Sequence, residues 1–126
     1  DAEERLRQLS QKYKIGVIAN QAPGARERLA GHGLLQYLDL VVSSAEEGVA
    51  KPDKRIFEIA LERSGCGPGQ AVMIGDRVDN DIVPANRLGF STIWVKQGFG
   101  RYWQVSRDIE KADAVVDSLK GLLEIL

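Results

Sequence analysis

The sequence contains few of the residues that mark a secreted, membrane-spanning or nucleic-acid-binding protein. Its 126 residues include a single cysteine, Cys66, so it has no internal disulfide framework, and a reducing, cytoplasmic compartment is expected. Apolar runs are far shorter than the roughly 20 residues of a membrane-spanning helix, so we expect no membrane contact and no secretory signal. The 17 basic and 18 acidic side chains nearly balance, which argues against binding nucleic acid through a strong positive field.

The composition is otherwise that of an ordinary soluble globular protein, with 44% hydrophobic and 28% charged residues. The length predicts one domain. The sequence begins with Asp1 and not with methionine. Either its start was removed, or it is a truncated piece of a longer chain.

Short apolar runs rich in β-branched residues alternate with charged segments of helical spacing. The runs predict strands at 14–20, 39–44, 70–75 and 90–95, and a short edge strand at 114–116. The charged segments predict helices at 2–13, from Pro23 to about Ala30, and at 53–64, 79–88 and 118–126. This alternation predicts an α/β sandwich with a parallel sheet. Because ligands bind beyond the carboxyl ends of such strands, the residues that follow each strand are the functional candidates.

Three acidic residues follow the strand at 70–75, which ends in a glycine that permits a sharp turn: Asp76, Asp79 and Asp81. Clustered carboxylates repel each other unless a cation lies between them, and Mg²⁺ prefers oxygen ligands. The alternative is that Asp79 caps the following helix and the other two form ordinary loop hydrogen bonds. We favour the cap for Asp79 and a functional role for Asp76.

Two further polar groups stand at strand ends or helix starts. Lys51 precedes Pro52, which holds the lysine extended, and its ammonium group suits a phosphate or a carboxylate. Asn20 and Gln21 follow the first strand, before a predicted helix whose free N–H groups could hold an anion. Taken alone, Lys51 is better interpreted as a solvated surface lysine, whereas Asn20 and Gln21 fit a cap or turn as well as a functional role.

The order of these segments resembles the haloacid dehalogenase-like (HAD) superfamily of hydrolases, from about Lys14 to Trp94. The specific signal is the combination of GVAKPDKRIFEIAL at 48–61 with VMIGDRVDNDI at 72–82. The resemblance implies a three-layer Rossmann-like sandwich with a mainly parallel sheet. It also implies a Mg²⁺-dependent phosphohydrolase that attacks a small phosphorylated substrate through an aspartate, forming an aspartyl-phosphate that water cleaves.

The resemblance also implies roles for individual residues. Lys51 matches the catalytic lysine that contacts nucleophile and phosphate. Asp76 matches the acid that binds Mg²⁺, and Asp81 matches the second acid, which supports the metal's water shell or orients the lysine. Residues 18–20 match the phosphate-binding motif. Its usual serine or threonine is replaced by Ala19, so we expect Asn20 or nearby N–H groups to bind phosphate instead.

The family's first motif, which supplies the nucleophile on the central strand of the sheet, has no counterpart in this chain. Without that strand, we expect the strands at 14–20 and 70–75 to keep unpaired edges or to pair with each other. We therefore expect self-association, or an N-terminal segment that completes the sheet. Residues 1–13 then correspond to a helical remnant of a cap or linker, and 14–126 to the core domain.

The sequence accordingly predicts a HAD-like phosphatase in the complete protein, inactive as this chain alone. The alternative is a non-catalytic HAD-like binding or scaffold module. Ala19 and the absent first motif favour the module, whereas retention of Lys51, Asp76 and Asp81 together favours the enzyme. A dinucleotide-binding domain is disfavoured because no G-x-G-x-x-G follows the first strand.

Overall fold

The computed structural model describes residues 2–20, 30–31, 33, 35–96 and 102–117. They divide into two compact units, 1–65 and 66–126. Strands and helices alternate in both units and every strand pair is parallel, which confirms the predicted α/β class. In the part of the chain described, no helix has both the length and the apolar character needed to cross a membrane.

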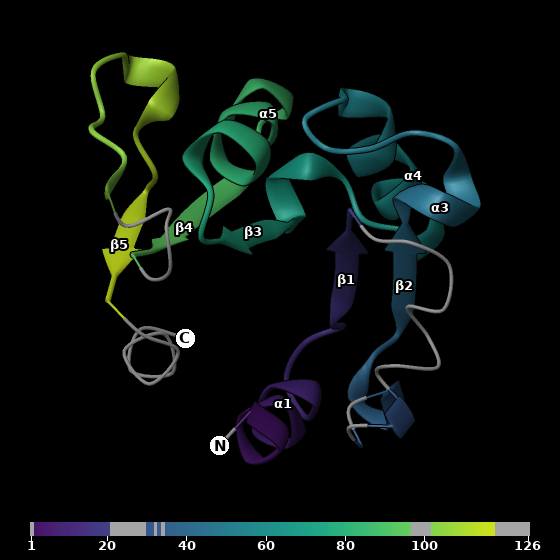
Figure 1. Cartoon of the computed structure of the whole chain (residues 1–126). Coiled ribbons are helices and arrows are strands. Elements are labelled where there is room, and N and C mark those ends of the chain that lie inside the picture. The colour runs from purple at the N-terminus through teal and green to yellow at the C-terminus, as the bar shows by residue number, and fades with distance from the viewer. Residues whose placement is uncertain (1, 21–29, 32, 34, 97–101, 118–126) are drawn as a thin grey trace. The chain divides into compact units, whose positions relative to one another are not determined.

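The first unit contains a two-stranded sheet with a helix packed against it. Strands β1 (Gly16–Ala19) and β2 (Leu40–Ser43) run side by side (Figure 1). Helix α4 (Lys54–Ser64) packs against both strands. Its buried side chains are spaced for one helix face, and they meet the buried residues of β2: Ile56, Phe57 and Ile59 on the helix, Val41 and Val42 on the strand.

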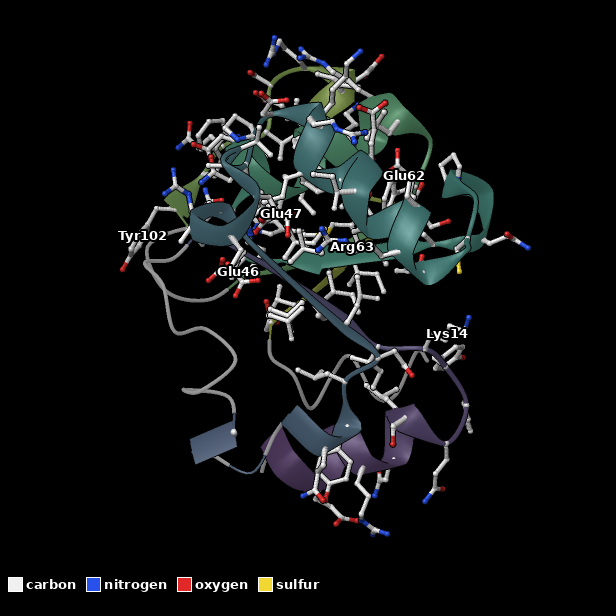
Figure 2. All side chains as sticks on the ribbon, turned by 90° about the vertical axis from the view of Figure 1, so that its right-hand side faces the viewer. Lys14, Glu46, Glu47, Glu62, Arg63 and Tyr102 are labelled. Atoms are coloured by element: carbon white, nitrogen blue, oxygen red, sulfur yellow. The ribbon has the colours of Figure 1, made fainter. Side chains whose placement is uncertain are left out.

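Capping interactions fix the ends of α4. The side chain of Asp53 accepts a hydrogen bond from the N–H of Arg55, and Gly65 ends the helix in a left-handed conformation at φ 72°. Where its elements are described, this unit also contains α1 (Ala2–Ser10), the 3₁₀ turn η1 (Leu35–Tyr37) and the short α3 (Ser44–Glu47). Arg63 of α4 donates two hydrogen bonds of 2.7 Å to Glu47 of α3, and Figure 2 shows these two side chains together.

The second unit contains a three-stranded sheet in the order β3 (Val72–Gly75), β4 (Ser91–Val95), β5 (Ala114–Val116) (Figure 1). The middle strand β4 is buried along most of its length, as a central parallel strand requires. Short 3₁₀ turns, η2 (Pro68–Gln70) and η5 (Asp108–Glu110), precede β3 and β5. Between β3 and β4 the chain forms a π-helical turn, η3 (Val78–Ile82), and then α5 (Val83–Leu88).

The predicted strands are present but mostly shorter, and the edge strand at 114–116 is confirmed at its predicted bounds. Predicted helices 2–13 and 53–64 correspond to α1 and α4. The predicted helix at 79–88 is instead η3 followed by α5, with Pro84 in the first turn of α5. The predicted helix at 118–126 lies outside the described residues, as does the predicted helix from Pro23 to about Ala30 except for Ala30 itself.

Strands β1 and β3 each have one neighbour among the described strands. The first pairs only with β2 and the second only with β4, and they belong to two separate sheets. Within the described residues, β1 and β3 therefore each keep one edge without a partner strand, the first of the two expected outcomes. An unpaired strand edge exposes N–H and C=O groups that can pair with another strand.

A buried polar network ties β4 to the segment before β5. The hydroxyl of Thr92, a fully buried residue, donates to Oδ1 of Asn86 at 2.8 Å. The Thr92 N–H donates to Oδ2 of Asp113, also at 2.8 Å. Asn86 in turn donates to the carbonyls of Ile109 and Lys111. Four segments of the second unit thus share one set of hydrogen bonds.

Thr92→Val keeps the shape of the side chain but leaves the Asn86 oxygen without its buried donor. We expect the free energy of unfolding to fall by about 1–3 kcal/mol, because an unsatisfied buried acceptor keeps its desolvation cost. Urea denaturation of the intact protein measures the change. Unaltered stability would show that the network contributes nothing net.

Candidate active site

The end of β3 places two carboxylates against one tight turn. Gly75 is the last residue of the strand, and Asp76 follows it directly. Asp81, on η3, is only 4% exposed. A Cβ atom built on Gly75 would lie 2.5 Å from Cβ and 2.6 Å from Cγ of Asp81, distances that real side chains do not reach. Only glycine therefore lets the Asp81 carboxyl group pack on the end of this strand.

The backbone of the turn also binds Asp81. The N–H of Arg77 donates to Oδ2 of Asp81 at 3.2 Å. The Asp76 side chain, which is half-buried, forms no hydrogen bond or ion pair with the residues that the structure describes. Asp76 and Asp81 thus lie on the same short segment, one directly after β3 and the other on η3. Their predicted functional role stays a prediction.

Asp79 has a different role from the predicted helix cap. Arg77 occupies the N-cap position of η3, without a side-chain capping bond, and its guanidinium group binds Asp79 through two hydrogen bonds of 3.1 and 2.7 Å. Oδ1 of Asp79 also accepts from the N–H of Asn80 at 2.9 Å. The cap interpretation is wrong because Arg77 and Ile82 occupy the N-cap positions of η3 and α5, and neither position has a side-chain capping bond. The hydrogen bond from Arg77 holds the pKa of Asp79 below its usual value. The same bond raises the pKa of Arg77.

In the first unit, the structure joins Asn20 to Lys51. Nδ2 of Asn20 donates to the Lys51 carbonyl at 2.9 Å, and the Lys51 N–H donates to Oδ1 of Asn20 at 2.8 Å. The Lys51–Pro52 peptide bond is cis. A single side-chain amide therefore binds both backbone groups of the lysine. Both residues are candidates from the sequence, but the hydrogen bonds between them are not predictable from it, because residues 31 positions apart form no local sequence pattern.

Trp94 on β4 is a neighbour of the acid pair that the sequence places only within the predicted strand at 90–95. Its indole N–H donates to the carbonyl of Asp76 at 3.1 Å. The ring also packs with Val78, Ile82 and Val83 in one buried cluster. An aromatic residue on a buried strand is the same sequence signal in either role, so no pattern could have distinguished them.

The donor set of the acid pair fits a hard divalent cation. Asp76 and Asp81 supply carboxylate oxygens and no nitrogen or sulfur. Oxygen ligands favour Mg²⁺ over softer metals. The described residues contain no group of three or more acids, histidines or cysteines able to hold a metal. Two carboxylates suffice for Mg²⁺, because this ion keeps several of its waters.

Comparison with known proteins identifies a family. Residues 48–122 match the model of the HAD-hydrolase-like family. The chain is 38% identical over 122 residues to a glyceraldehyde 3-phosphate phosphatase of Methanothermobacter thermautotrophicus, covering 93% of this chain and 53% of that protein. The chain thus spans about half the length of the curated relatives it matches.

Solved structures agree with this comparison. A HAD phosphatase from Thermococcus onnurineus superposes with a TM-score of 0.82 at 30% identity, covering 97% of this chain and 54% of that one. A 2-haloacid dehalogenase from Pseudomonas syringae gives a TM-score of 0.81 at 31% identity, covering 98% and 50%. The family model matches more than half of this chain, and Rossmann-like HAD structures superpose on it. The chain therefore belongs to the HAD-like hydrolases.

Proposed function

We propose that this chain is part of a cytoplasmic, Mg²⁺-dependent phosphatase that hydrolyses small phosphorylated substrates. The observation that carries the proposal is the pair of carboxylates, Asp76 and Asp81, set on one turn at the carboxyl end of β3. The phosphatase relatives support the reaction type. That the metal is Mg²⁺, that the protein is cytoplasmic and that the named residues have these roles are parts of the proposal.

The reaction requires an aspartate nucleophile, which we place on a segment outside this chain. A carboxylate oxygen attacks phosphorus, the bond from phosphorus to the leaving oxygen breaks, and water hydrolyses the resulting aspartyl-phosphate. Asp76 and Asp81 would hold Mg²⁺, which supplies positive charge against the phosphoryl oxygens. Lys51 neutralises the nucleophile and phosphate. Asn20 binds phosphate with the amide hydrogen that does not bond the Lys51 carbonyl.

A non-catalytic binding module is the second candidate, favoured by the buried Ala19 at the end of β1, where the family carries a hydroxyl. Hydrolysis measured on the intact protein separates the two functions. p-Nitrophenyl phosphate and glyceraldehyde 3-phosphate with Mg²⁺ test the phosphatase, and a 2-haloacid tests the reaction of the dehalogenase relative. Absence of turnover with all three would support the module.

Asp76→Asn removes the negative charge proposed to bind the metal. We expect kcat to fall by about 10³-fold or more, because charge stabilisation worth several kcal/mol is lost. Asp79→Asn is the matched control, since Asp79 lies in the same turn but is bound to Arg77. It should stay within about twofold of wild type. Full activity of Asp76→Asn would remove Asp76 from the metal site.

Asn20→Ala removes the amide that binds both backbone groups of Lys51. We expect kcat/KM for p-nitrophenyl phosphate to fall by about 10²-fold, because a small displacement of a catalytic group has effects of this size. Gln36→Ala is the control, since Gln36 also donates its side-chain amide to a backbone carbonyl, that of Gly33. Equal kinetics of the two variants would show that Asn20 does not position Lys51.

We further propose that one strand outside this chain pairs with the free edges of β1 and β3. The 126-residue chain produced alone should then associate or unfold without a single cooperative transition, because both edges are open to non-native pairing. Light scattering after size exclusion and thermal unfolding test this. The intact protein is the control and should be better behaved. A monomeric chain with one cooperative transition would refute the proposal.

A further inference from the structure

Trp94 contacts both parts of the turn that carries the acid pair. Its indole N–H donates to the Asp76 carbonyl at 3.1 Å, and its ring packs with Val78 and Ile82 of η3, the turn that contains Asp81. Trp94 itself is 4% exposed. The indole N–H needs an acceptor when it is buried, but most acceptors in a sheet are already used by neighbouring strands.

One peptide group connects the tryptophan to both acids. The carbonyl of this group belongs to Asp76 and accepts from Trp94, while its N–H belongs to Arg77 and donates to Oδ2 of Asp81 at 3.2 Å. A peptide group is planar, so fixing its carbonyl also fixes the direction of its N–H. Successive hydrogen bonds through one peptide also polarise each other.

The ring of Trp94 is also contacted by a cation. The ammonium group of Lys96 lies 5.2 Å from the centroid of the ring, within the range of a cation–π interaction. Packing with the cluster and this cation restrict the ring, and a restricted ring gives its N–H one defined position.

We infer that Trp94 is a positioning residue for the acid pair: through the Asp76–Arg77 peptide group it fixes the main chain of Asp76 and the carboxylate of Asp81, the two acids proposed to hold a divalent cation. This inference rests on the proposed function and assigns to it a residue that touches neither metal nor substrate. Residues that orient metal ligands from outside typically change metal affinity when they are replaced.

The test is the affinity of the intact protein for Mg²⁺, measured by isothermal titration calorimetry without substrate. Trp94→Phe keeps an aromatic ring and removes the N–H. We expect its dissociation constant for Mg²⁺ to rise by about 10-fold. Thr92→Val is the matched control, because it removes another buried hydrogen bond of β4 that does not reach Asp76. It should bind Mg²⁺ as wild type does, although it is less stable.

Should Trp94→Phe not fold, Trp94→3-benzothienylalanine replaces the N–H by sulfur in a ring of the same size, and the same loss of affinity is expected. Unchanged affinity in the folded variant, or an equal loss in Thr92→Val, would overturn the positioning role. If the wild-type protein binds no Mg²⁺, the proposed metal site fails and this inference fails with it. The wild-type titration thus separates the two failures.

Discussion

The peptide group between Asp76 and Arg77 is the point on which the acidic end of β3 depends. Its carbonyl is held by Trp94 and its N–H binds the Asp81 carboxylate. The adjoining Gly75 leaves the space into which that carboxyl group packs. The planar Asp76–Arg77 peptide group therefore fixes the main chain of Asp76 and binds the Asp81 carboxylate, and the absence of a side chain on Gly75 gives that carboxylate room.

In the first unit, a side-chain amide and not a peptide group positions the candidate residue. The amide of Asn20 donates to and accepts from the backbone of Lys51, so the lysine is held at its main chain. The bidentate pair of Arg63 and Glu47 ties α3 to α4, close in sequence to the same lysine. In both units the groups nearest the proposed chemistry are positioned through the backbone.

The two sheets differ from the interior of a complete parallel sheet in how their strands are paired. A parallel strand in a sheet interior needs a neighbour on each side, and β1 and β3 each have one among the described strands. The curated relatives are about twice as long as this chain. The chain thus has the local elements of a HAD-like hydrolase on two separate sheets.

The sequence by itself determined the α/β class, the family and the choice of candidate residues, because strand periodicity and the two long motifs are local signals. The predicted helix at 79–88 was wrong at its start, where a π-helical turn with Arg77 at its N-cap precedes α5. Only the tertiary structure decided which backbone groups Asn20 binds and that Trp94 reaches Asp76. These contacts join segments 18 and 31 residues apart, and such pairs leave no period in the sequence.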